Sequence, residues 1–119
     1  SAISRLQDIG IEPYLISSSL LAVLAQRLLR RTCPVCRGVG EVSGHRCDKC
    51  FGSGFSGRVA IYEIMRMSDE IRRLTMTTAD ARAIKQLAAR EGMRDMIEDG
   101  RDKVARGLTT ETELHRVLA

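Results

Sequence analysis

The sequence has 119 residues, enough for one ordinary domain or for a piece of a larger one. Hydrophobic residues make up 44% of it and aromatic residues only 3%, which favours a core of aliphatic side chains of the kind that helices bury. The formal net charge of +4 is a weak argument for a nucleic-acid partner. The longest apolar run, residues 20–25, is far too short to span a bilayer, and no targeting segment opens the chain. We therefore expect a soluble cytoplasmic protein with reduced thiols.

The first 31 residues predict helices followed by a strand. Apolar side chains recur at roughly helical spacing up to Ile9, and Gly10 and Pro13 stop that segment. The next segment predicts a helix over residues 13–25, which is apolar on all sides from Leu20 onwards and is therefore expected to be buried. A short strand over residues 26–31 follows it. We interpret the apolar segment as a core helix rather than a membrane anchor.

All the cysteines of the chain lie in one stretch, as two Cys-x-x-Cys pairs. Two residues between thiols let the backbone form a tight knuckle, and two knuckles supply the four ligands of a tetrahedral zinc site. Glycine follows each pair at the same two offsets, where a positive φ turns backbone amides toward the sulfurs. Four protein ligands leave no open position for a substrate, so a structural metal is expected. The candidate metal ligands are Cys33, Cys36, Cys47 and Cys50.

Other uses of four cysteines stay open at this point. Two disulfides are one, although nothing here resembles a signal peptide or a secreted scaffold. An iron–sulfur cluster is another, because spacing alone does not exclude it. A redox motif is less favoured, since such a motif normally stands alone at the start of a helix. His45 lies two residues before Cys47, and we interpret it as an exposed loop histidine rather than a ligand.

After the cysteines, residues 58–66 predict a strand of β-branched and aromatic residues. Its alternation is imperfect, because Glu63 shares a face with Val59, Ile61 and Met65. A carboxylate on that face needs a basic partner unless it lies in water. We interpret Glu63 as an edge-strand charge in water.

The remainder of the chain predicts a small bundle of four short helices. Ser68 is expected to cap the first and Thr77 the second, Gly107 to stop the third, and Thr110 and Glu113 to form a capping box on the fourth. The third carries a stripe rich in methionine, which we interpret as core packing. The predicted helices span residues 68–76, 77–92, 93–107 and 110–118.

Signatures of catalysis are missing from the sequence. No stretch fits the phosphate-binding pattern G-x-x-x-x-G-K-[ST], and the histidines His45 and His115 form no recognisable Ser–His–Asp constellation. No catalytic or cofactor-binding residue is nominated. Taken alone, this chain is not expected to be an enzyme.

Three ordered segments nevertheless resemble a known family over residues 2–118. AISRLQDIGIEPYLISSSLLAVLAQRLLRRTCPVC resembles the end of the motor domain in secretion and pilus ATPases: the GspE-like ATPase of type II secretion and the PilB-like ATPase of type IV pili. CDKCFGSGFSGRVAIYEIM looks like the second half of that family's tetracysteine segment, and DGRDKVARGLTTETELHRVL is similar to its C-terminal helices. Residues 37–46 form a shorter connection than is usual in GspE-like members.

The resemblance implies the C-terminal portion of a hexameric ATPase with an α+β, mostly helical fold. Residues 1–32 would be the C-terminal end of a RecA-like motor domain, residues 33–57 a tetracysteine zinc-binding segment, and residues 58–119 a short strand with a C-terminal helical subdomain. The family's Walker A loop, its acidic magnesium-binding segment and its catalytic histidine segment lie upstream of this chain. ATP and magnesium are thus implied only for the parent protein, and only the four cysteines carry over, as zinc ligands.

The same resemblance implies partners and a location. The parent would act in a homo-hexamer at the inner membrane, peripheral to it on the cytoplasmic side, where ATP hydrolysis drives assembly of a pilus or pseudopilus and protein secretion. Neighbouring subunits and inner-membrane platform proteins would be its partners, and no nucleic acid is expected. Two alternatives remain: a DnaJ-type zinc module of a chaperone, whose repeat is also Cys-x-x-Cys-x-Gly-x-Gly, and a nucleic-acid-binding zinc ribbon.

Overall fold

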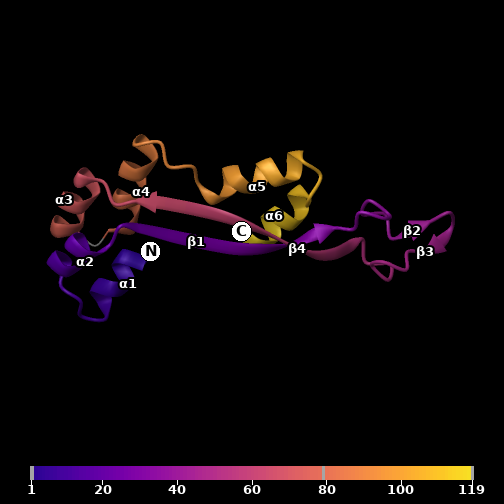
Figure 1. Ribbon diagram of the computed structural model, residues 1–119, viewed down its shortest axis with the longest axis horizontal. Helices are drawn as coiled ribbons and strands as arrows, with labels where there is room; N and C mark the ends of the chain where they lie inside the picture. The colour runs from indigo at the N-terminus through magenta and orange to yellow at the C-terminus, as the bar shows by residue number, and fades with distance from the viewer. Residues whose placement is uncertain (1, 79, 119) are drawn as a thin grey trace. The chain divides into compact units, whose positions relative to one another are not determined.

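The computed structural model describes residues 2–78 and 80–118, which form a mixed fold of helices and small sheets (Figure 1). The strands make two two-stranded sheets, one from β1 and β4 and the other from β2 and β3. None of the helices within the described ranges has the length and apolarity that crossing a membrane requires. In chain order the elements are α1 (Ala2–Asp8), α2 (Pro13–Ser19), β1 (Ala22–Thr32), β2 (Glu41–Val42), β3 (His45–Arg46), β4 (Phe55–Arg66), α3 (Asp69–Thr77), α4 (Ala81–Arg90), α5 (Met96–Ala105) and α6 (Glu111–Leu118).

The chain divides into two compact units, each built from two separate segments. The first unit comprises Ser1–Ala25 and Glu63–Asp95, and the second comprises Gln26–Tyr62 and Met96–Ala119. Strands β1 and β4 each contribute residues to both units. Helices α3 and α4 belong to the first unit, and α5 and α6 to the second, so the four predicted tail helices divide into two pairs.

The helix predicted over residues 13–25 is wrong in its second half. Helix α2 ends at Ser19, and the apolar residues that follow enter β1. Ser18 donates its hydroxyl hydrogen to the carbonyl of Tyr14, a side-chain bond of the kind that competes with helical structure. Along the start of β1 exposure alternates, with Val23 and Ala25 half-buried and Leu24 exposed, which is the two-residue period of a strand. The apolar residues at the start of β1 therefore lie on both faces of a strand and do not surround a buried helix.

The core of the first unit is aliphatic, as the composition predicts. Helix α3 begins as expected, because the Ser68 hydroxyl accepts a hydrogen bond from the Ile71 amide at 3.2 Å. The predicted cap of α4 is wrong: Thr77 is the last residue of α3, and the carboxylate of Asp80 accepts the Arg82 amide instead, at 2.9 Å. Residue 79, within the predicted helix 77–92, lies outside the described residues. The buried members of this core are Ile3, Ile16, Met67, Ile71, Ile84 and Ala88.

The second unit has a smaller core beside the cysteine segment. Leu29 of β1 and Ile61 of β4 are fully buried there, together with Leu114 of α6. Gly100 lets α5 approach α6 closely, because a β-carbon at that position would collide with the side chain of Leu114. The predicted strand over residues 58–66 is confirmed and begins earlier, at Phe55. The predicted stop at Gly107 is also confirmed, since its φ is +75°.

Candidate metal centre

The four cysteine sulfurs converge on one point in the second unit. Each sulfur lies within 4.8 Å of the other three, and each cysteine is at most 6% exposed. The sulfurs of Cys33 and Cys47 are 3.8 Å apart, and those of Cys36 and Cys50 are 3.6 Å apart. A tetrahedral zinc ion about 2.3 Å from each sulfur would place neighbouring sulfurs about 3.8 Å apart. The residues present therefore fit a single tetrahedral ion.

This geometry separates a single ion from the alternatives that spacing left open. The cross-pair sulfur distances of 3.6 and 3.8 Å are far longer than a disulfide bond of about 2.05 Å, and all four cysteines are free. In an iron–sulfur cluster the thiolates bind different iron atoms, which spreads them apart. Four sulfurs gathered this closely instead match one ion.

Backbone amides stabilise negative charge on the sulfurs. Gly40 donates its amide hydrogen to the sulfur of Cys36, and Gly54 donates to the sulfur of Cys50, both at 3.2 Å. Burial raises the pKa of Cys50, but the Gly54 amide and the sulfurs of Cys36 and Cys47 outweigh it and lower that pKa to about 6. A thiol deprotonated at neutral pH is the form that binds metal.

Cys33 and Cys47, the first cysteine of each pair, have pKa values shifted in opposite directions. The Cys36 amide lowers the pKa of Cys33, against the effect of burial. The Cys50 amide acts in the same direction on Cys47, but burial and the sulfurs of Cys50 and Cys33 raise the Cys47 pKa overall. The Cys47 thiol therefore holds its proton more tightly than an ordinary thiol, whereas Cys33 loses its proton more readily.

His45 lies on a short hairpin between the two cysteine pairs. Strands β2 and β3 pair antiparallel, with Val42 opposite His45, across a turn in which Ser43 and Gly44 both have positive φ. His45 is exposed, and the group of possible metal ligands among the described residues consists of the four cysteines alone. The interpretation of His45 as exposed is confirmed, although it lies in a strand rather than a loop.

The sequence did not predict that the carboxylate of Glu113 is buried and paired with Arg30, three residues before the first cysteine. The Glu113 side chain is 0% exposed and accepts hydrogen bonds from Arg30, at 2.6 Å from the guanidinium and 3.3 Å from the amide, and from Arg116. Arg116, and then Arg30, lower the Glu113 pKa from 4.5 to about 2 despite burial. The expected capping box is half formed, because the Glu113 amide donates to the Thr110 hydroxyl while the carboxylate turns to the arginines.

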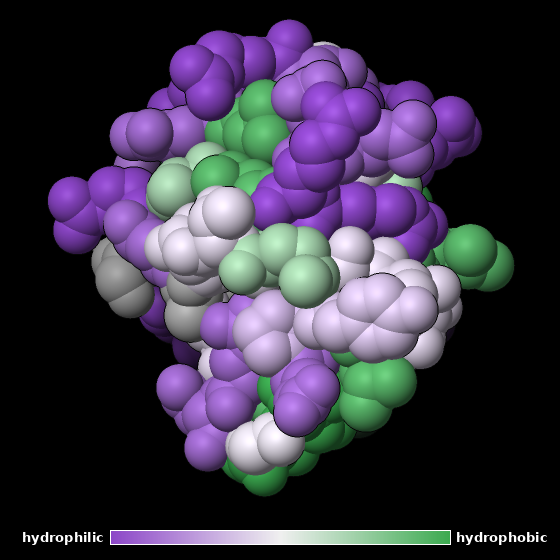
Figure 2. Space-filling view, turned by 90° about the vertical axis from the view of Figure 1, so that its left-hand side faces the viewer, coloured by the Kyte–Doolittle hydropathy of each residue, from purple (hydrophilic) through white to green (hydrophobic). Residues whose placement is uncertain are grey.

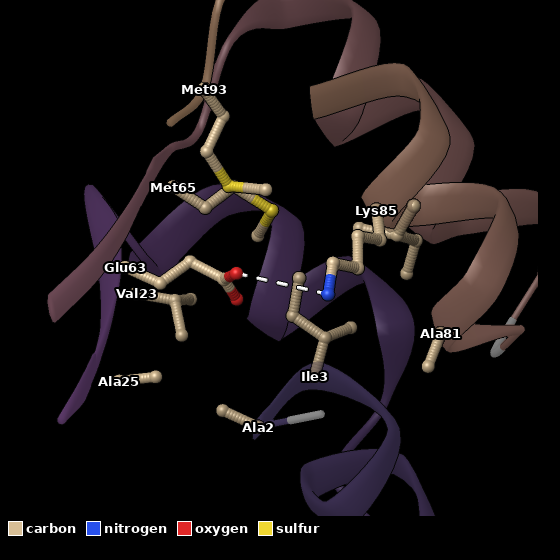
Figure 3. A pocket seen from close by; sticks show the side chains of 10 residues that line it. Ala2, Ile3, Val23, Ala25, Glu63, Met65, Ala81, Lys85 and Met93 are labelled. Carbon is tan, nitrogen blue, oxygen red and sulfur yellow. Dashed lines mark ion pairs between the residues drawn. The ribbon is translucent and has the colours of Figure 1, made fainter. Parts of the chain in front are cut away.

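Glu63 does not lie in water, so the interpretation of it as an edge-strand charge is wrong. Its side chain is 22% exposed, and its carboxylate is 3.7 Å from the amine of Lys85 on α4. The two point toward each other past Ile3, at a cavity of about 290 Å³ in the first unit (Figure 3). Among the described residues the rest of the lining is apolar, so these residues provide an ion pair and no catalytic constellation. Sequence alone could not find Lys85 as the partner, because only the fold brings α4 beside β4.

Comparison with known proteins places this geometry in a family. The model of the family described as type II/IV secretion system protein matches residues 1–116. The type II secretion system protein HxcR of Pseudomonas aeruginosa is 47% identical over 120 residues, covering 98% of this chain and 25% of that protein. The type IV pilus assembly ATPase PilB of Thermus thermophilus is 38% identical over 139 residues, covering 99% of this chain and 15% of that protein.

A third relative has a similar identity and a similar coverage. The type II secretion system ATPase E of Vibrio cholerae is 37% identical over 137 residues, covering 98% of this chain and 27% of that protein. The chain thus spans about a quarter or less of the length of these relatives. The matches favour the predicted resemblance over a chaperone module or a nucleic-acid-binding ribbon. A family match over residues 1–116, with relatives aligned over nearly the whole chain, shows that this chain belongs to the type II/IV secretion system protein family.

Proposed function

We propose that this chain is the C-terminal zinc-binding structural and coupling module of a hexameric secretion or pilus-assembly ATPase. The observation that carries the proposal is the group of four buried sulfurs, whose spacing fits one tetrahedral ion, within a chain of this family. Most of the length of the relatives lies outside the matched region. In this proposal ATP and magnesium bind there, and that part of the parent hydrolyses ATP.

The metal site is assigned to Cys33, Cys36, Cys47 and Cys50, with zinc as the ion. Zinc bound by four thiolates would act as a structural cross-link and supply no open coordination position for chemistry. The chain's own contribution is to bury the sulfurs and to direct the Gly40 and Gly54 amides at two of them. These amide–sulfur bonds stabilise thiolate charge and fix the orientation of the ligands.

The first segment of the chain is proposed to be the end of the RecA-like motor domain, over residues 1–32. Several large apolar side chains there are more than half exposed, as expected of a surface that further protein covers. Figure 2 looks onto the side of the first unit where α1 and α2 lie with α3 and α4, and it shows apolar surface among polar side chains. Residues 33–57 and 58–119 would be the zinc-binding segment and the C-terminal helical subdomain. The exposed apolar residues include Ile9, Tyr14, Leu15 and Leu21.

The coupling role is supported by hydrogen bonds between the residues just before the first cysteine and the start of α6. Arg30 donates to Glu113, and its carbonyl accepts from the Thr109 hydroxyl at 2.9 Å. The Thr32 amide donates to the Leu108 carbonyl, also at 2.9 Å. A displacement of the helical tail would therefore be passed to the metal-binding segment through β1.

The proposed partners follow from the family relation. Neighbouring subunits of a homo-hexamer and inner-membrane platform proteins would contact this module, and the parent would be cytoplasmic and peripheral to the inner membrane. Native mass spectrometry of the full-length parent tests the hexamer. A monomer at all nucleotide states would contradict it.

Metal analysis of the freshly purified chain, with thiol counting in denaturant, tests the metal site. We expect one zinc per chain and four free thiols after chelation. No metal, or fewer than four thiols, would contradict the site. The chain alone is expected to hydrolyse no ATP above a buffer control, and genuine turnover would contradict the assignment of catalysis to the rest of the parent.

A further inference from the structure

The two cysteine repeats, residues 33–40 and 47–54, contact each other reciprocally. Equivalent residues lie 14 positions apart and face one another: the sulfur of Cys33 faces that of Cys47, and the sulfur of Cys36 faces that of Cys50. Contact between equivalent atoms is what an internal two-fold arrangement produces. The repeats are thus two halves of one site.

The last glycine of each repeat binds both halves. Gly40 donates its amide to Cys36 of its own repeat, and its carbonyl accepts the amide of Cys47 from the other repeat at 2.8 Å. Gly54 makes the equivalent bonds: its amide donates to the sulfur of Cys50 in its own repeat, and its carbonyl accepts the amide of Cys33 from the other repeat at 2.9 Å. Each of these glycines therefore holds one sulfur of its own pair and the backbone of the first cysteine in the other pair.

Space at these two positions admits only glycine. A β-carbon on Gly40 would lie 2.7 Å from the carbonyl oxygen of Gly52, and one on Gly54 would lie 2.6 Å from the carbonyl oxygen of Gly38. Both obstacles are backbone atoms of the other repeat, so no side-chain rotation relieves them. A side chain at either position would push the two cysteine pairs apart.

We infer that Gly40 and Gly54 are positioning residues that lock the two cysteine pairs together, so that neither pair presents its sulfurs to a metal without the other. The inference rests on the proposed metal site. It gives Gly40 and Gly54 a role beyond adopting a positive φ, which glycine allows at many turns. Glycine is needed at these positions because the two repeats touch there, in addition to its freedom of backbone conformation.

The chain supplies controls that are matched in backbone conformation. Gly38 has a φ of +86° beside +87° for Gly40, and Gly52 has +84° beside +83° for Gly54. A β-carbon at Gly38 or Gly52 would meet only side-chain atoms, at 3.4 and 3.5 Å, which is ordinary contact. Alanine at these two positions carries the left-handed strain without the collision.

Zinc affinity of the purified chain, measured by competition with a chromogenic chelator, tests the inference. We expect Gly40→Ala and Gly54→Ala each to bind zinc about 10- to 100-fold more weakly than Gly38→Ala and Gly52→Ala. Equal affinities for the collision variants and their controls would overturn the lock while leaving the metal site intact. A wild-type chain that binds no zinc would overturn the site and the lock together.

Amide hydrogen exchange on the zinc-loaded wild-type chain tests the same inference without any variant that needs to fold. The amides of Cys33, Gly40, Cys47 and Gly54 are expected to show one common protection factor once each rate is divided by the intrinsic rate of that amide, because opening either half breaks bonds to the other. Protection factors that differ by more than about tenfold between the repeats would overturn the lock, since each half would then open by itself.

Discussion

Replacing Glu113 with glutamine would remove a buried charge that joins α6 to β1. Glutamine keeps the size of the side chain but replaces one acceptor oxygen with a donor that faces two arginines. A buried, hydrogen-bonded carboxylate that loses its charge leaves its partners poorly satisfied. We therefore expect the Glu113→Gln chain to unfold more readily at neutral pH.

The magnitude follows from the pKa of the carboxyl. A shift from 4.5 to about 2 corresponds to about 3.4 kcal/mol at the usual conversion, as an upper bound. The side chains of Arg30 and Arg116 are 50% and 56% exposed, so solvent screens part of this energy and about 1 to 2 kcal/mol is expected. Because the folded-state pKa is lowered, the stabilisation is present above about pH 4.5 and is lost as the pH falls toward 2.

Urea unfolding of both chains between pH 7 and pH 2.5 measures this dependence. Thiol protonation affects both chains alike, so it cancels in the difference between them. We expect a difference of about 1 to 2 kcal/mol at pH 7 that shrinks steadily below pH 5. Glu111→Gln on the same helix is the matched control, because its exposed pair with His115 should contribute less than about 0.5 kcal/mol. A difference that stays constant over this pH range would refute the role of the Glu113 charge.

Three further predictions concern the caps, the helix packing and the metal. Ser68→Ala should lower the unfolding free energy by about 1 kcal/mol and Ser68→Thr, which keeps the hydroxyl, by much less, in thermal melts followed by circular dichroism; equal losses would show that the cap contributes nothing. Gly100→Leu should cost about 1 to 3 kcal/mol by forcing α5 away from Leu114, and an unchanged midpoint in urea would contradict that packing. Chelation of the metal should make residues 33–57 sensitive to protease and all four thiols reactive, whereas unchanged digestion after complete metal removal would mean that the metal is not structural.

The cysteine cluster could be predicted from sequence because its determinants are local. Each Cys-x-x-Cys pair and its two glycines occupy eight consecutive residues, and the backbone turns that gather the sulfurs depend on residues within that span. The caps at Ser68 and Thr110 were predicted for the same reason, since each bond reaches only three residues along the chain. The cross-repeat contacts of Gly40 and Gly54 were not predicted, because they join residues of different repeats.

Two of the errors occurred where residues distant in sequence decide the structure. The apolar content of residues 20–25 suits a buried helix as well as a strand, and it is the pairing of β1 with β4 that places residues 22–25 in a strand. Glu63 is shielded from water because α4 brings Lys85 to it across 22 positions of sequence. The cap at Asp80 instead of Thr77 was a local choice between two good capping residues only three positions apart.

The interleaved segments of the two units constrain the order in which the chain can fold as it leaves the ribosome. The first unit needs Glu63–Asp95, so it cannot close until the cysteine segment has already been synthesised, and the second waits for residues beyond 96. Between the end of β1 at Thr32 and the start of β4 at Phe55 the nascent chain is an open loop. A metal that joins the two cysteine pairs shortens this loop, and each halving lowers the entropic cost of pairing the strands by about 0.6 kcal/mol. A metal bound by the four cysteines would thus favour the pairing of β4 with β1 before the rest of the chain is complete.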